Sequence, residues 1–172
     1  TEWNIEEACS ALDKSPSELK VVVMDRPRHE KLIKELRALD VAVPLIGDGD
    51  VSAALNAADP NSDIDMLMGI GAAPEGIITA TALRGLDAPF EGRLVFRNEG
   101  HRERAEGMIA DDIDRVWQRD ELCSSSDSVF IGTGVCSGRT NGVEMMEGGT
   151  ARVHSEIIDV SSMEHSFATT VI

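Results

Sequence analysis

An apolar run, a polar or glycine-rich loop and an amphipathic segment follow one another three times between residues 20 and 86. This repetition restricts the fold more than any other feature of the chain. The apolar runs cover residues 21–24, 41–46 and 64–68, and a further run at residues 93–96 predicts a fourth strand. Short apolar runs of this kind are typical of strands buried on both faces of a parallel sheet. The sequence therefore predicts an α/β fold with three layers, in which helices cover a mostly parallel sheet.

Each of the first three predicted strands ends in a loop of unusual composition. These loops cover residues 25–29, 47–50 and 69–76. In open α/β sheets, ligands bind at the carboxyl ends of the strands. Since the three loops would all lie along that one edge, we expect a functional site there.

The first loop carries two arginines on either side of a proline. Pro27 fixes its own φ and biases Arg26 toward extended geometry, so both arginine side chains start from a restrained backbone. Two guanidinium groups in an otherwise acidic chain are suited to clamping a phosphate, and Arg28 would supply the second. Ordinary surface arginines at the start of a helix are the alternative. We interpret His29 as a helix-start or packing residue rather than as a base.

The second loop places two carboxylates around a glycine. Gly49 permits a positive φ, and Asp50 is predicted to be the N-cap of a helix over residues 51–58. Asp48 has no such structural role in the sequence. It could accept hydrogen bonds from sugar hydroxyls or hold a metal.

The third loop, residues 69–76, is made almost entirely of small residues. Small residues let the backbone approach a ligand closely, and Pro74 is suited to the first turn of a helix. A helix start offers unpaired N–H groups and the positive end of a dipole, which favour phosphate. Glu75 either stabilises the helix start or is a metal ligand directed at the phosphate.

The composition restricts the partners of the chain. The formal charge of −15 argues against general binding of nucleic acid or of anionic membranes, and it is compatible with divalent cations. No apolar run approaches the roughly 20 residues of a membrane helix. The three cysteines are widely spaced and predict reduced thiols, as in the cytoplasm, with the plastid stroma as an alternative. The histidines show no spacing typical of zinc.

The rest of the chain is expected to complete a single α/β domain over residues 1–172. A leading helix is predicted within residues 1–18, βα repeats within 20–123, and a β-rich tail within 124–172. The acidic cluster at residues 111–114 lacks the glycine and the distal glutamate of a calcium loop, so we interpret it as a surface turn. Strands in the tail are predicted at residues 129–131, 151–160 and 166–172.

Three segments in this order closely resemble class II fructose-1,6-bisphosphatases. They are VVVMDRPRH at residues 21–29, DGDV at residues 48–51 and MGIGAAPEG at residues 68–76. The bifunctional fructose-1,6-/sedoheptulose-1,7-bisphosphatase type is the most similar. Residues 85–94 and 133–138 extend the likeness over most of the chain. The resemblance implies the lithium-sensitive, metal-dependent sugar-phosphatase superfamily.

The resemblance also implies roles for individual residues. Glu75 would be a ligand of a divalent metal, Mg²⁺ or Mn²⁺. Ala72 stands in the substrate-contacting turn, where many family members have glycine. No catalytic residue is assigned. The other residues that would contact the sugar bisphosphate are Arg26, Pro27, Arg28, Asp48, Gly49 and Asp50.

The implied activity is hydrolysis of the 1-phosphate of fructose 1,6-bisphosphate by a metal-activated water. The amino-terminal half of the family, with its other metal carboxylates, has no match here. We therefore expect the chain to correspond to the carboxyl-terminal half, with the missing half supplied in cis or in trans. A sugar-phosphate binding module without catalysis is the alternative. The expected partners are the sugar bisphosphate and further copies in a homo-oligomer, with no nucleic acid and no membrane.

Overall fold

The computed structural model describes all 172 residues, which form two compact units, Thr1–Glu75 and Gly76–Ile172. Each unit is described by itself. Helix α4 (Ala73–Gly85) begins in the first unit and continues in the second. None of the helices combines the length and the apolar character needed to cross a bilayer. The other elements of the first unit are α1 (Glu2–Leu12), η1 (Pro16–Glu18), β1 (Val21–Met24), η2 (Pro27–His29), α2 (Glu30–Ala38), β2 (Leu45–Ile46), α3 (Asp50–Ala57) and β3 (Met66–Leu67).

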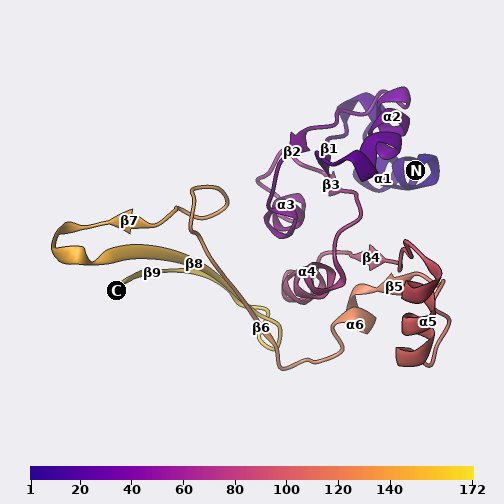
Figure 1. The fold of residues 1–172 in the computed structure, drawn as a ribbon. Coiled ribbons are helices and arrows are strands. Elements are labelled where there is room, and N and C mark those ends of the chain that lie inside the picture. The colour runs from indigo at the N-terminus through magenta and orange to yellow at the C-terminus, as the bar shows by residue number, and fades with distance from the viewer. The chain divides into compact units, whose positions relative to one another are not determined.

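The first unit contains a parallel sheet in the order β2-β1-β3 (Figure 1). Val23 of β1 pairs with Leu45 of β2, and Val21 pairs with Met66 of β3. All four residues of β1 are buried, as expected for the central strand of a covered sheet. The prediction of a parallel sheet built by βα units is thus confirmed for three strands. Membership of the sugar-phosphatase superfamily stays a prediction.

Two helices pack against the central strand. Ile5 of α1 and Ile33 of α2 join Val21 and Val23 in one buried cluster. Because side chains alternate across a strand, these two valines share one face of the sheet. Helix α3 packs against β3. The amphipathic segments predicted between the strands therefore serve to bury the sheet.

The second predicted strand is shorter than residues 41–46 because of Pro44. Val21 N–H donates to Ala42 O at 2.9 Å, and Val23 N–H donates to Pro44 O at 3.1 Å, so the segment does lie along β1. Pro44 has no N–H to return a hydrogen bond, and only Leu45–Ile46 completes a ladder. The strand predicted over residues 41–46 therefore exists next to β1, but its predicted length was wrong.

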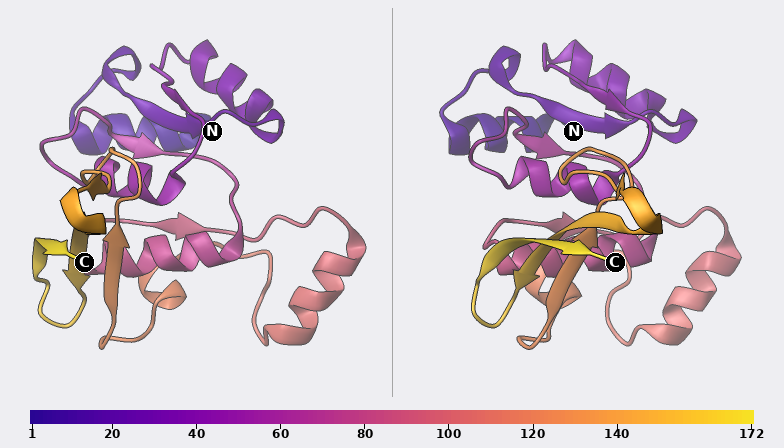
Figure 2. Two further views of the ribbon diagram at one scale, coloured as in Figure 1. Left: turned by 60° about the vertical axis from the view of Figure 1, so that its left-hand side comes forward. Right: turned by 90° about the vertical axis from the view of Figure 1, so that its left-hand side faces the viewer.

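The second unit is built on antiparallel pairs. β4 (Glu91–Gly92) pairs with β5 (Trp117–Gln118), and a larger sheet has β8 at its centre, with β6 and β7 on one side and β9 on the other. The β8–β9 hairpin is its longest part (Figure 2). The remaining bounds are α5 (Glu99–Met108), α6 (Arg119–Leu122), β6 (Val129–Thr133), β7 (Glu144–Met145), η3 (Glu147–Gly149), β8 (Ala151–Asp159) and β9 (His165–Val171).

The fourth strand predicted at residues 93–96 is wrong. The segment has no strand partner, and the sheet is not extended there. The pairing with β5 uses the preceding residues Glu91 and Gly92 instead. The guanidinium of Arg102 lies over the ring of Phe96, and its Cζ is 4.6 Å from the ring centroid. A residue of α5 thus packs against this apolar side chain. An apolar sequence pattern alone cannot distinguish such a contact with a helix from a contact within a sheet.

Gly85 allows α4 to approach β8 closely, and this leads to a first prediction. A Cβ at Gly85 would overlap with the side chain of Ile158, which is completely buried. We expect Gly85→Ala to lower the free energy of unfolding by about 1–3 kcal/mol through overpacking. Urea denaturation monitored by amide exchange in β8 measures this.

Gly107, in α5, provides the matched control. A Cβ there would meet no atom within 4 Å. Gly107→Ala should stabilise by up to about 1 kcal/mol through helix propensity. Equal effects of the two alanine variants would contradict close packing at Gly85.

Candidate functional site

The three predicted loops lie together at the carboxyl edge of the parallel sheet. β1 is the central strand, so the loop that follows it has a neighbour on each side. Asp25 N–H donates to Ile46 O at 2.8 Å. Arg26 reaches the loop after β2, and Arg28 reaches the loop after β3. Residues that are distant in the sequence are thus brought together at one edge of the sheet in the first unit.

Both arginines are held by backbone carbonyl groups. Arg26 donates from Nη1 to Asp25 O at 2.9 Å and from Nη2 to Gly47 O at 2.6 Å. Arg28 donates from Nε to Ile70 O at 2.7 Å. Neither has a carboxylate partner. A carbonyl oxygen orients a guanidinium without neutralising it, so both groups keep their full charge and free N–H donors for an anion.

Several other arginines of the chain are paired with carboxylates, although Arg37, Arg93, Arg97 and Arg104 are not. Arg102 donates to both carboxylate oxygens of Asp114, at 2.8 and 2.7 Å, and this hydrogen bonding holds the pKa of Asp114 below its usual range. Arg115 lies 3.1 Å from Asp111. The acidic cluster at residues 111–114 is therefore paired with arginines on the surface, in agreement with its interpretation as a turn. Arg26 and Arg28 differ from these arginines because backbone carbonyl groups alone hold them in place.

The second loop has the predicted backbone conformation with a different cap. Gly49 has φ +84° and is itself the N-cap of α3. Asp50 was predicted to be the cap, but it is the first helical residue, and its Oδ1 accepts from Val51 N–H at 2.9 Å. Asp48 Oδ1 accepts from Gly49 N–H at 2.9 Å. Each aspartate therefore has one oxygen that accepts a local hydrogen bond and one oxygen that accepts none.

The glycines of the third loop serve contacts within the protein. A Cβ at Gly69 would lie 3.2 Å from the His29 ring, and a Cβ at Gly71 would lie 3.2 Å from Asp50 Oδ2. The sequence suggested that small residues here admit a ligand. The structure shows that they also admit side chains from the other two loops.

His29 joins the first loop to the third. It is 1% exposed, its Nδ1 lies 2.8 Å from Met24 O, and its Nε2 accepts from Ile70 N–H at 2.8 Å. The interpretation of His29 as a packing residue captured its burial and missed its two hydrogen bonds. The signal available in the sequence was a histidine directly after two site arginines.

The remaining predicted site residues are exposed on the same loops. Pro27 begins the short helix η2, and Ala72 precedes α4. Glu75 lies in the first turn of α4, where a carboxylate stabilises the helix start, and its side chain makes no ion pair or hydrogen bond. Glu75 is thus available to a ligand.

The whole chain matches one family of phosphatases. A family model described as bacterial fructose-1,6-bisphosphatase, glpX-encoded, matches residues 1–171. The chain belongs to the class II fructose-1,6-bisphosphatase family. This confirms the resemblance carried by the three loop segments.

Curated relatives come from cyanobacteria and bear the name D-fructose 1,6-bisphosphatase class 2/sedoheptulose 1,7-bisphosphatase. A protein of Synechococcus sp. (strain JA-2-3B'a(2-13)) is 40% identical over 183 residues, covering 99% of this chain and 52% of the relative. A protein of Microcystis aeruginosa is 40% identical, covering 98% and 52%. A protein of Crocosphaera subtropica is 41% identical, covering 93% and 50%. The chain described here spans about half the length of these relatives.

Class II fructose-1,6-bisphosphatases are metal-dependent, so the side chains of this chain can be compared with what a metal site requires. No group of three or more His, Cys, Asp or Glu side chains is arranged to hold an ion. Glu75 offers a single free carboxylate. Mg²⁺ in phosphate-binding sites is held by one or two carboxylates together with phosphate oxygens and water. Glu75 fits the role of one such carboxylate, and it does not form a metal site by itself.

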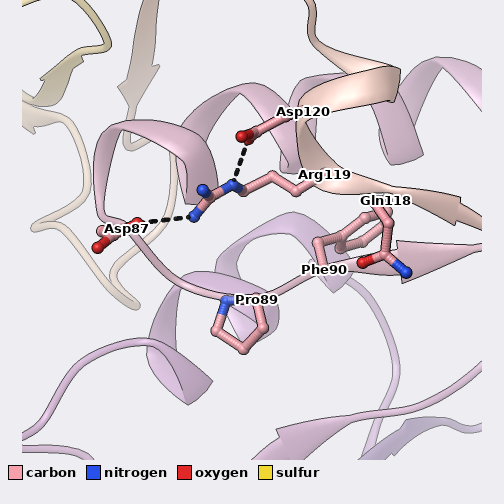
Figure 3. A pocket seen from close by; sticks show the side chains of 6 residues that line it. All are labelled: Asp87, Pro89, Phe90, Gln118, Arg119 and Asp120. Atoms are coloured by element: carbon pink, nitrogen blue, oxygen red, sulfur yellow. Dashed lines mark hydrogen bonds and ion pairs between the residues drawn. The ribbon is translucent and has the colours of Figure 1, made fainter.

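A shallow hollow in the second unit was not predicted, and it is a weak candidate for an anion site. Arg119 lies in it between two carboxylates, 2.7 Å from Asp120 and 3.3 Å from Asp87 (Figure 3). Hydrogen bonding to Asp120 raises the pKa of Arg119, which stays charged and paired. The hollow therefore differs from the edge of the parallel sheet, where the arginines have carbonyl partners. Its lining residues are Asp87, Pro89, Phe90, Gln118, Arg119 and Asp120.

Proposed function

We propose that this chain binds fructose 1,6-bisphosphate at the carboxyl edge of its parallel sheet and supplies the substrate-binding half of a phosphatase. The reaction would release the 1-phosphate and leave fructose 6-phosphate. The family supports the reaction class, because the relatives are named as bisphosphatases. The observation that carries the proposal for this chain is the pair of oriented arginines without carboxylate partners.

Each loop would have a distinct task in this proposal. Arg26 and Arg28 would donate to phosphoryl oxygens and offset their charge. The free oxygens of Asp48 and Asp50 would accept hydrogen bonds from sugar hydroxyls. Ala72 and Pro27 would shape the edge without adding charge. When bound, a divalent metal would supply charge neutralisation and an activated water, with Glu75 as one of its ligands.

Calorimetric titration of the chain with fructose 1,6-bisphosphate tests the proposal. We expect one binding site and an affinity that falls as the salt concentration rises, because charged groups make the contacts. Fructose 6-phosphate should bind more weakly, since it lacks one phosphate. Failure of the bisphosphate to bind with and without Mn²⁺ would contradict the proposal.

Glu75 gives a prediction that can be read without catalysis. We expect Mn²⁺ to increase the affinity for fructose 1,6-bisphosphate, and Glu75→Gln to remove this increase while leaving the affinity in metal-free buffer unchanged. The amide keeps the shape of the side chain and loses its charge. Glu7→Gln is the control, because it removes the same charge from an exposed position on α1. An unchanged effect of Mn²⁺ in Glu75→Gln would rule out the metal role.

A binding module without catalysis is the second candidate, favoured by the absence of a cluster of metal-ligating side chains. Phosphate release separates the two. Binding without release in the presence of Mg²⁺ and Mn²⁺ would support the module for this chain. Release of inorganic phosphate that requires the metal would support the phosphatase.

A further inference from the structure

The two hydrogen bonds of His29 determine its protonation state. Met24 O can only accept, so the ring must donate to it from Nδ1, at 2.8 Å. Ile70 N–H can only donate, so Nε2 must accept from it, at 2.8 Å. Both contacts are satisfied by one species, the neutral ring with its proton on Nδ1. Burial of the ring leaves no water to replace either partner.

Ile70 connects this ring to a predicted phosphate-binding arginine. Its N–H is held by His29 Nε2, and its C=O accepts from Arg28 Nε at 2.7 Å. His29 therefore holds the peptide group that enters Ile70, and the peptide group that leaves Ile70 carries the oxygen bound by Arg28. Arg28, which is exposed and has no other hydrogen bond, takes its orientation from that carbonyl.

Gly69 provides a second, independent sign that the ring is built into this loop. A Cβ at Gly69 would lie 3.2 Å from both Cε1 and Nε2 of His29. The backbone of the third loop thus packs directly against the imidazole, on the side of Nε2, where no side chain intervenes. Any other residue at this position would push the ring away from Ile70.

We propose that His29 is a positioning residue, whose neutral Nδ1–H ring holds Ile70 and thereby aims the Arg28 guanidinium at the bound phosphate. The consequence for substrate rests on the proposed function. The hydrogen-bonded arrangement itself can be tested without ligand. His29 contacts no substrate in this arrangement and acts through the backbone of Ile70.

Two conservative variants separate the two hydrogen bonds of the ring. The amide oxygen of glutamine can take the place of Nε2, so His29→Gln keeps the acceptor for Ile70 and loses the donor to Met24. The amide nitrogen of asparagine can take the place of Nδ1, so His29→Asn keeps the donor and loses the acceptor. A purely structural role predicts similar losses for both, since each variant loses one buried hydrogen bond.

Nuclear magnetic resonance and titration together give the decisive readouts. We expect the Nε–H signal of Arg28 to be protected from exchange in the wild type and in His29→Gln, and to lose protection in His29→Asn. The dissociation constant for fructose 1,6-bisphosphate should rise about fivefold in His29→Asn, the worth of one hydrogen bond, and stay within about twofold in His29→Gln. Equal behaviour of the two variants in either measurement would overturn the proposal.

The tautomer keeps the proposal testable if His29→Asn does not fold. The ¹⁵N shifts of the wild-type ring should show a proton on Nδ1 and a bare Nε2 at neutral pH. A proton on Nε2 would overturn the proposal. If the wild type binds no bisphosphate, the proposed function fails, while the Arg28 signal and the tautomer still decide the positioning role.

Discussion

Replacing Glu156 by alanine is expected to lower the free energy of unfolding of the second unit by about 3–5 kcal/mol, the cost of breaking a buried ion pair from one side. Glu156, on β8, is 2% exposed. Arg139 Nε donates to its two oxygens at 2.9 and 2.7 Å, and Nη2 adds a third contact at 2.6 Å. His165 Nε2 lies 2.8 Å from the same carboxylate. The alanine variant leaves the buried guanidinium without this compensation.

Amide exchange in β8 and β9 during urea denaturation measures this loss. Glu144→Ala is the matched control, because Glu144 pairs with Arg152 on the same sheet at 2.7 Å, and their side chains are 48% and 41% exposed. Exposed ion pairs contribute little to the free energy of unfolding, so Glu144→Ala should change amide exchange far less than Glu156→Ala does. Comparable losses from the two variants would contradict the importance of burial.

The double variant Arg139→Leu/Glu156→Leu separates the stability contributed by the ion pair from the stability contributed by filling the buried volume. Removing both charges together avoids leaving one of them uncompensated, and apolar replacement of a buried pair is often neutral. We therefore expect the double variant to recover most of the stability lost in Glu156→Ala. A loss at least as large as that of the single variant would show that the pair itself stabilises the sheet.

The convergence of the three loops could be predicted from the sequence because it follows from connectivity alone. Parallel strands joined by helices end at one edge, so the apolar runs before Asp25, Gly47 and Gly69 were enough to place the loops together. The parallel pairing in the structure confirms this part of the fold. Recognition of the family rested on the same loops.

The local chemistry within the loops could not be read from residue types. A sequence cannot tell that Gly71 makes room for Asp50, or that Ile70 offers one backbone group to His29 and the other to Arg28. These contacts depend on the distance between loops that are more than 20 residues apart. The fourth strand failed for a related reason, since an apolar side chain such as Phe96 can be satisfied by a helix as well as by a sheet.

The double variant Arg26→Met/Arg28→Met is expected to weaken binding of fructose 1,6-bisphosphate by at least about a hundredfold. A hydrogen bond between charged groups contributes about 1.5–3 kcal/mol, and each arginine has free N–H donors for a phosphate. Methionine keeps an apolar stem of similar length, so much of the local packing is retained. Calorimetry against the bisphosphate measures the change.

The double variant Lys34→Met/Arg37→Met removes the same two charges from the exposed side of α2 and controls for net charge. Long-range attraction of an anion should weaken equally in both double variants, and salt screens that part of the effect. At high salt we therefore expect the control to match the wild type, while Arg26→Met/Arg28→Met remains impaired because it lacks the direct donors. If both double variants recover together as salt is added, the arginines act only through the field of the protein, and the phosphate clamp at the sheet edge would have to be abandoned.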